Sequence, residues 1–513
     1  MKSLLAVSLL FVFSLSISFS FAQNVTITPD GITPATPNLY PRLSHDALMA
    51  LPNPQSGDIA YDVTFRCLRL YNGTKWARLM TDVELNTPSM TAWSVGGVGS
   101  ESSRSIAVDT LGNVYIAGYI SGTTVFGNDT IVSAGLADVF VAKYTKEGVL
   151  QWVKHGGGSA YDYANNVKVD KSGNVYITGV FEGTASFDSL SITAVGVMDI
   201  FIIKYNSEGQ LQWLKQGNAA NYGYGFALAI DINDDLYVTG SFGLSADFGK
   251  GTITSVSSHD VFIAKYDGTG DLKWVQKAGG VLNDIAYGIA VDSAGFVFIT
   301  GYFQSSASFG TINVTSAGNG DIFIAKYDPF LLKWDWVINN GSAGTEIGTD
   351  LAVDKNGNIY VTGIFDGSIN FSDTMLSGKG GNDIFVAKYN SAGTLAWVRS
   401  AGGTGNDESL GLALDASGNA YVTGSFNSVA SFDQLSLISV GMRDTFIAKY
   451  ATNGTPQWVQ RAGSIDNDEG KDIAIDAGNN IYITGYFTGI NLFGSTPVTS
   501  AGSGDIYIAR IKE

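Results

Sequence analysis

Carboxylates recur at two fixed positions of this sequence, and carboxylates in such a pattern could bind a cation. One series opens apolar segments and comprises Asp138, Asp199, Asp260, Asp321, Asp383, Asp444 and Asp505. The other lies in preceding loops and comprises Glu101, Asp162, Asp284, Glu346, Asp407 and Asp468, with Gly223 in the remaining place. Hard cations bind several oxygen ligands at once. The second series therefore supplies candidate metal ligands, with Ca²⁺ as the candidate ion.

A structural role is the alternative for the same acids, and the sequence favours it. A carboxylate that recurs in nearly every repeat can accept backbone N–H groups of its own loop, and a site usually breaks such symmetry. The stretch G-G-T-G-N-D at residues 402–407 resembles a Ca²⁺-binding nonapeptide only superficially, because its period is not nine residues. We expect a scaffold role more than a metal site.

Departures from the repeat are a better place to look for a ligand site. Two consecutive loops are rich in tyrosine, with Tyr161, Asp162 and Tyr163 in one and Tyr222 and Tyr224 in the next. Exposed aromatic rings can stack on a sugar ring while neighbouring polar groups bond its hydroxyls. We take these five residues as candidate ligand-binding residues. The alternative is that the rings fill gaps between loops.

Signals for catalysis are poor, and no residue is assigned as catalytic. The three histidines, His45, His155 and His259, share no position in the repeat. Neither a nucleophile elbow nor a phosphate loop occurs in a suitable context. Paired carboxylates could act as the catalytic groups of a polysaccharide hydrolase or lyase, so such an enzyme is an alternative function.

The elements that position these residues come from an internal repeat. The motif I-A-V-D-x-x-G-N recurs with its aspartate at Asp109, Asp170, Asp231, Asp292, Asp354, Asp415 and Asp476, spaced 61 or 62 residues apart. A tryptophan strand and the D-I-F segment follow the same rhythm. Three markers with one period identify seven repeats.

Each repeat contains four short segments rich in β-branched and aromatic residues, joined by glycine turns, which predicts a four-stranded antiparallel unit. We therefore predict an all-β, seven-bladed β-propeller of four-stranded antiparallel blades over residues 87–513. The repeats begin with an outermost strand and end with a third strand. Residues 91–95 should therefore supply the outer strand of the last blade and close the ring. The carboxylates then fall on one face, near the mouth of the channel.

The repeat resembles a known family. I-A-V-D-x-x-G-N-V-Y-I-T-G-Y-F, followed by D-I-F-I-A-K-Y and L-Q-W-V-K, is similar to the bacterial seven-bladed β-propeller repeats called SBBP repeats. The resemblance covers residues 91–513. It implies the propeller fold and an extracytoplasmic setting, and it brings no agreed catalytic residues.

The segments before the repeats differ in kind. Residues 1–22 have the pattern of a signal peptide, with cleavage near Ala22. Residues 23–86 predict a small extended and β-hairpin module with a linker, in which Asn72-Gly73 marks the turn and Cys67 is a packing residue. The run from Tyr61 to Trp76 resembles a short hairpin module of exported bacterial surface proteins.

Charge and composition limit the partners. The formal net charge is −17 with a pI near 4.5, and no cluster of basic residues offers a nucleic-acid footprint. No later stretch predicts a membrane span, so the mature chain should have no transmembrane segment. We expect a secreted or extracytoplasmic binding scaffold for a glycan or protein partner, with a purely structural envelope role as a further alternative. The propeller should be monomeric, with association possible through residues 23–86.

Overall fold

The computed structural model describes residues 25–28, 31–34, 42–55, 58–62, 67–71, 74–78, 88–494 and 496–513. The chain forms two compact units, Met1–Pro88 and Ser89–Glu513. The predicted signal peptide at residues 1–22 and the Asn72-Gly73 turn lie outside the described residues. Among the helices of the described segments, none has the length and apolar character needed to cross a bilayer.

The first unit contains a short helix and a small sheet. Strands β1 (Val25–Thr28) and β2 (Gly31–Pro34) pair with each other, and β3 (Arg42–Leu43), β4 (Ile59–Asp62), β5 (Cys67–Tyr71) and β6 (Trp76–Arg78) form a second sheet in that order. Helix α1 (His45–Met49) begins after Ser44, whose hydroxyl accepts the N–H of Ala47 at 3.3 Å. Leu48 and Trp76 belong to its small buried core.

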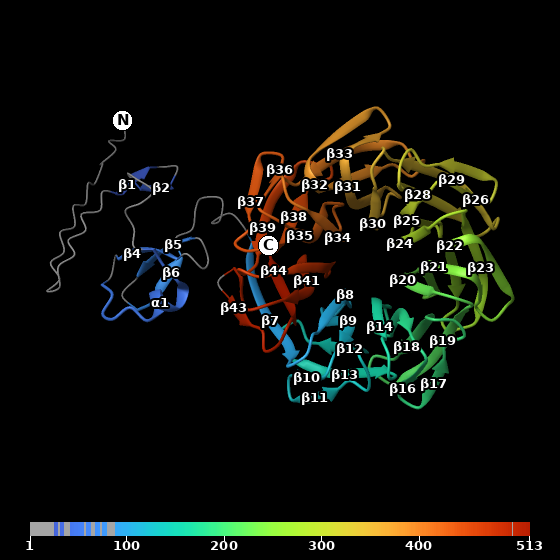
Figure 1. The fold of residues 1–513 in the computed structure, drawn as a ribbon, viewed down its shortest axis with the longest axis horizontal. Coiled ribbons are helices and arrows are strands. Elements are labelled where there is room, and N and C mark those ends of the chain that lie inside the picture. Colours follow the sequence, from blue (N-terminus) through green and yellow to red (C-terminus); the bar gives the residue numbers. More distant parts are fainter. Residues whose placement is uncertain are drawn as a thin grey trace. The chain divides into compact units, whose positions relative to one another are not determined.

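The second unit is a ring built from repeated runs of antiparallel strands (Figure 1). The innermost strands, around the centre of the ring, are β8 (Ser102–Val108), β14 (Tyr163–Val169), β20 (Gly223–Ile230), β24 (Asp284–Val291), β30 (Ile347–Val353), β34 (Glu408–Leu414) and β40 (Glu469–Ile475). The second strands are β9 (Val114–Ile120), β15 (Val175–Phe181), β21 (Leu236–Asp247), β25 (Val297–Phe303), β31 (Ile359–Phe371), β35 (Ala420–Phe426) and β41 (Asn480–Phe487).

The outer half of each run follows the same order. The third strands are β12 (Asp138–Tyr144), β18 (Asp199–Tyr205), β22 (Thr252–Tyr266), β28 (Asp321–Asp328), β32 (Thr374–Tyr389), β38 (Asp444–Tyr450) and β44 (Asp505–Lys512). The outer strands are β13 (Leu150–Gly157), β19 (Leu211–Ala219), β23 (Leu272–Gly280), β29 (Lys333–Asn340), β33 (Leu395–Ala401), β39 (Pro456–Ala462) and β7 (Ser89–Gly97). Strand β7, which contains residues 91–95, pairs with β44, so strands from the two ends of this unit lie side by side.

The long segments between second and third strands form hairpins rather than loops. They comprise β10 (Thr123–Phe126) with β11 (Asp129–Val132), β16 (Thr184–Phe187) with β17 (Leu190–Thr193), and β26 (Ser306–Phe309) with β27 (Ile312–Thr315). Two further hairpins pair β36 (Val429–Phe432) with β37 (Leu435–Ile438) and β42 (Ile490–Phe493) with β43 (Thr496–Thr499). In the other two repeats the same segment forms the ends of long paired strands, β21 with β22 and β31 with β32.

These hairpins overturn the prediction of seven blades that are each a sheet of four strands. In the described part of residues 89–513, the strands join instead into six main sheets: two of six strands, one of ten, and three of four. The physical reason is edge pairing, because an outer strand exposes unpaired backbone groups that a neighbouring strand can satisfy. Strand β10 pairs with β7, β16 with β13, and β26 with β23, so these three hairpins extend the sheet of the preceding run, whereas β36–β37 and β42–β43 form two-stranded sheets of their own.

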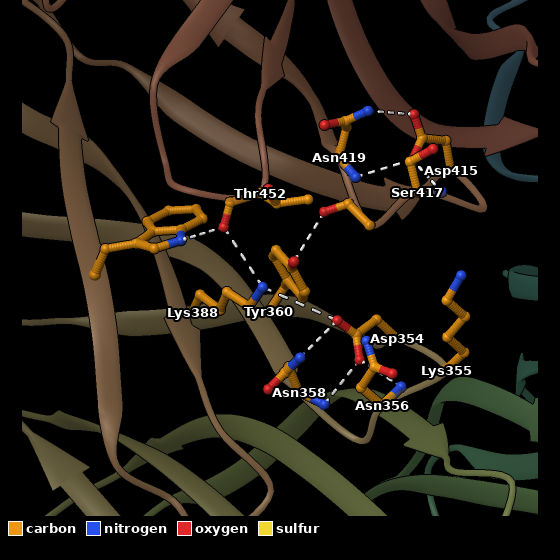
Figure 2. A network of polar contacts seen from close by, with 12 residues as sticks. Asp354, Lys355, Asn356, Asn358, Tyr360, Lys388, Asp415, Ser417, Asn419 and Thr452 are labelled. Carbon is orange, nitrogen blue, oxygen red and sulfur yellow. Dashed lines mark hydrogen bonds and ion pairs between the residues drawn. The ribbon is translucent and has the colours of Figure 1, made fainter.

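The D-x-x-G-N motif makes tight hairpins on one face of the ring, which we call the hairpin face. Asp354 accepts the N–H groups of Asn356 at 2.8 Å and Asn358 at 3.0 Å (Figure 2). The residue three positions after the aspartate has a positive φ in every repeat: Gly112, Gly173, Asp234, Gly295, Gly357, Gly418 and Asn479. The aspartate therefore stabilises a turn that needs a left-handed residue.

The same face ties neighbouring repeats together. Tyr360 donates its hydroxyl to the carbonyl of Gly418 in the next hairpin at 2.8 Å (Figure 2). Lys388 and the indole of Trp397 both donate to the carbonyl of Thr452, at 3.4 and 3.0 Å. Lysine, tyrosine and tryptophan recur in the repeat because they make these contacts and fill the apolar space between sheets.

Candidate ligand-binding site

The chain passes from each outer strand to the next innermost strand on the opposite face, which we call the junction face. The loop acids there are fully buried, and each accepts the backbone N–H of the residue four positions earlier. Gly158 donates to Asp162 at 2.6 Å, and Ser464 donates to Asp468 at 2.6 Å. The same bond recurs at Asp284, Glu346 and Asp407. These carboxylates therefore organise their own loops.

The aspartates that open the third strands lie close to the loop acids. Burial, with a smaller contribution from the nearby Asp505 carboxylate, raises the pKa of Glu101 to about 7. Burial raises the pKa of Asp284 to about 7, with Asp260 as the neighbouring charge. Asp407 follows the same pattern, with burial and Asp383 bringing its pKa to about 6. Two buried carboxyl groups thus meet at each of these junctions, and a proton on one of them removes their repulsion.

The structure gives these acids no arrangement suited to a cation. Within the described residues, no group of three or more His, Cys, Asp or Glu side chains could hold a metal ion. Asp162, predicted both as a metal ligand and as a ligand-binding residue, has 0% of its surface exposed. With no exposed surface, Asp162 cannot contact a ligand on the surface.

The predicted tyrosines form two stacked groups on the junction face. Tyr161 stacks on Tyr163, with ring centres 5.8 Å apart and ring planes 26° apart, and Tyr119 meets Tyr163 edge-on at 5.0 Å. Tyr161 is 41% exposed. In the next repeat, Tyr222 stacks on Tyr224 at 6.2 Å with planes only 3° apart.

Alternate residues of β20 continue the second stack towards the next innermost strand. Tyr224 stacks on Phe226 at 5.5 Å and 7°, and Phe226 meets Tyr287 of β24 at 4.9 Å. His259 lies 6.0 Å from Tyr224. Tyr163, Tyr224 and Phe226 are all half-buried. Their partial exposure leaves a band of aromatic surface on neighbouring repeats.

One position on each innermost strand bulges out of register with the second strand. It is occupied by Arg104, Asn165, Phe226, Tyr287, Thr349, Leu410 and Lys471. A β-bulge disrupts the local ladder and re-aims a side chain, and bulges are frequent beside functional sites. This position keeps its geometry around the ring while its chemistry changes in every repeat. At this position the side chain can therefore differ between repeats without disturbing the backbone of the ring.

Arg104 contacts the first tyrosine group and is linked through Asn165 to the backbone of β20. Its guanidinium carbon lies 4.7 Å from the ring centre of Tyr163 and 5.3 Å from that of Tyr119. Its Nη1 donates to the side-chain oxygen of Asn165 at 2.6 Å, and Asn165 donates to the carbonyl of Gly225 at 2.9 Å. The burial of Arg104 lowers its pKa, but an arginine remains charged.

A second cationic group, formed by Arg443 and Lys471, lies in the last two repeats of the sequence. Arg443 pairs with Glu408 at 2.8 Å and with Glu469 at 3.2 Å. Lys471 pairs with Glu469 and lies 5.6 Å from the ring centre of Tyr486. The cations of this group therefore carry their own counter-charges.

The innermost strands also line a channel with a cavity of about 360 Å³. Asp472 accepts the hydroxyl of Ser105 at 2.6 Å and the N–H of Ile106 at 2.9 Å, and Asp350 accepts the N–H of Leu412 at 2.8 Å. Burial and the charge of Asp472 raise the pKa of Asp350 to about 7. These acids bridge neighbouring innermost strands within the channel.

Sequence reasoning located the tyrosine loops but missed Arg104, Asn165 and Phe226. The signal was present, because aligning the repeats at the fifth residue before the hairpin aspartate exposes the variable position. Its meaning depends on the bulge, which strand propensity does not predict.

A ring of antiparallel strands around a side-chain-lined channel defines the class: this is a β-propeller. Residues 96–127, 273–302 and 338–363 match the family model SBBP, described as a beta-propeller repeat. The chain therefore carries SBBP β-propeller repeats, as its motifs predict. The resemblance suggested for the N-terminal hairpin module is not confirmed by these matches, all of which lie in the ring.

Two curated proteins show more limited similarity. An uncharacterized WD repeat-containing protein of Acanthamoeba polyphaga mimivirus is 23% identical over 469 residues, covering 71% of this chain and 33% of that protein. Regulatory protein FlaEY of Caulobacter vibrioides is 30% identical over 135 residues, covering 26% of this chain and 14% of that protein. The chain thus spans about a third or less of each relative's length.

Several solved propellers are similar at low sequence identity. The WD40 propeller domain of Doa1 is 10% identical with a TM-score of 0.43, covering 83% of this chain and 97% of that chain. The polysaccharide lyase Uly1 is 9% identical with a TM-score of 0.37, covering 92% and 96%. Similarity at this level says nothing about a ligand.

Proposed function

We propose that this protein is an exported, non-enzymatic binding scaffold whose junction face holds a glycan. The observation that carries the proposal is the band of half-exposed stacked rings formed by Tyr161 and Tyr163 and by Tyr222, Tyr224 and Phe226. Flat aromatic faces beside amide side chains suit a sugar, which has apolar ring faces and hydroxyl edges.

The energetics favour a modest affinity spread over several subsites. Aromatic contacts contribute about 0.5–1.5 kcal/mol each beyond the area that they bury. Single contacts of this size give weak binding, so a useful affinity requires several sugar units. An extended glycan that crosses two repeats could contact both tyrosine groups at once.

The proposal is tested by titrating the full chain with neutral and acidic oligosaccharides while recording calorimetric heats and tyrosine fluorescence. Removing a ring with Tyr161→Ala or Tyr224→Ala should weaken binding by about 2- to 10-fold each. Phe330→Ala is the matched control, because Phe330 is 70% exposed and lies against Gly295 in a hairpin-face turn. Binding that is lost in the control, or kept in both tyrosine variants, would reject the junction face as the site.

A further inference from the structure

Arg104 differs electrostatically from the other cations of the junction face. Arg443 and Lys471 each pair with glutamates. Among the described residues Arg104 makes no ion pair within 4.0 Å, and its one hydrogen bond goes to the neutral amide of Asn165. Arg104 is partly buried, and a partly buried cation without a counter-charge is costly unless something else compensates it. A cation without an acidic partner is unusual in a chain whose acidic residues outnumber its basic ones, with a net charge of −17.

Part of that cost is offset by aromatic rings. Tyr163 and Tyr119 lie within 4.7 and 5.3 Å of the guanidinium carbon, within the range of cation–π attraction. The hydrogen bond to Asn165 fixes one nitrogen at 2.6 Å. Together these contacts hold the plane of the guanidinium in one orientation. Little side-chain entropy is then left to lose when a ligand binds.

The rest of the guanidinium can still be reached from solvent. The buried unpartnered nitrogens of the described residues include those of Arg443 and Arg510, but none of Arg104. Within the part of the chain that the structure describes, no protein acceptor bonds Nε or Nη2 of Arg104, and neither nitrogen is among the fully buried unpartnered atoms, so both keep some solvent contact. Two N–H groups on one edge of a fixed guanidinium match the two oxygens of a carboxylate.

This inference rests on the proposed glycan-binding function and specifies its ligand. We propose that Arg104 binds the carboxylate of a uronic acid, and that this face of the protein recognises acidic polysaccharides. The guanidinium edge donates two N–H groups to the carboxylate while the sugar ring lies over Tyr161, the exposed ring of this group. The counter-charge that Arg104 lacks in the protein is supplied by the ligand. An acidic peptide would satisfy the charge but not the exposed aromatic faces, so the glycan is favoured.

The test compares oligogalacturonate with its fully methyl-esterified form, in which the carboxylates are neutral and the sugar is unchanged. Calorimetry on the full chain at about 0.15 M salt, which screens the long-range repulsion from the net charge of −17, should show about 10-fold or tighter binding of the acidic form, because hydrogen bonds to charged groups are stronger than neutral ones. Arg104→Gln should abolish this preference while binding of the esterified form persists. Arg104→Lys should retain part of it, because the charge remains without the paired N–H groups.

A control variant and an acidic peptide distinguish the possible reasons for a negative result. Arg399→Gln removes one charge from outer strand β33 and should leave the preference intact. Equal binding of both sugars by the unaltered chain, or a preference kept in Arg104→Gln, overturns the role of Arg104 but leaves the glycan site standing. If neither sugar binds, the proposed function fails as well. If oligoglutamate binds as tightly as the uronate and depends on Arg104, the site is one for an acidic protein, and the glycan assignment is overturned. Thermal unfolding of each variant establishes that it is folded.

Discussion

The buried carboxyl junctions and the bulge position of the innermost strands share one face of the ring and differ in what the repeats keep constant. At the junctions, almost every repeat has an acid that accepts a backbone N–H and faces the aspartate of the preceding repeat. At the bulge, the backbone is constant and the side chain changes from Arg104 through Phe226 to Lys471. Constant chemistry maintains the ring, whereas variable chemistry on a constant backbone is available for recognition.

The largest effect should follow from crowding a junction. A Cβ on Gly341 would collide with the carboxyl group of Asp321. Gly341→Ala should therefore lower the free energy of unfolding by about 3 kcal/mol, the upper end of the usual cost of overpacking, measured by urea denaturation. Gly268→Ala is the control, because a Cβ there meets nothing closer than 3.8 Å and its φ is not positive. A loss of similar size in the control would mean that the junctions are not specially packed.

The junctions should also make the ring less stable as the pH rises. Folding raises the pKa of Glu101, Asp284 and Asp468 to about 7, from ordinary values near 4. The folded chain then binds more protons than the unfolded chain in the window between these values. Stability from these groups is full below about pH 4 and lost as the pH rises through about 7.

The free energy of unfolding should accordingly fall by at least about 2 kcal/mol between about pH 5 and pH 8, as measured by urea denaturation across that range. Asp284→Asn removes one titrating group and should make the decline shallower. A stability that rises with pH across this window would show that the junction carboxylates are charged and paired in the folded state.

A smaller effect, confined to binding, is expected from the variable position. Phe226→Ala removes the ring that joins Tyr224 to Tyr287 and should weaken glycan binding by about 2- to 10-fold, measured by calorimetry. Ring stability, compared by thermal unfolding, should change less than it does in Gly341→Ala. The reverse pattern, a large loss of stability with unchanged affinity, would assign Phe226 to the core.

The smallest effect should come from a bulge residue outside the aromatic band. Leu410 is half-buried and lies at the same position of β34. Leu410→Ala should change the free energy of unfolding by less than about 1 kcal/mol and leave glycan affinity unchanged, as checked by denaturation and calorimetry. A marked loss of affinity in this variant would extend the site beyond the tyrosine groups.

The repeat, its strands and its turns could be predicted from the sequence because each depends on local chemistry. Asp354 and Gly357 define their own hairpin wherever the chain runs. The grouping of strands into sheets could not, because the pairing of β10 with β7 joins segments from different repeats. Outer strands with free edges accept such pairing without any mark in their own residues.

The candidate site was likewise predictable only in part. Tyr161, Tyr163, Tyr222 and Tyr224 could be identified because they break the repeat. Asp162, taken with them, turned out to be buried, because its loop folds its carboxylate inward onto Gly158. Arg104 lies 61 residues before Asn165 and becomes its neighbour only when the ring brings β8 beside β14. Contacts between residues of different repeats cannot be predicted from the repeat pattern alone.

A crystal structure of the full chain with a bound oligogalacturonate tests the central claim most directly. We expect sugar density on the junction face, with a ring stacked on Tyr161 and a carboxylate at the guanidinium edge of Arg104. Sugar density on the hairpin face, or ligand contacts that leave Arg104 and both tyrosine groups untouched, would contradict it.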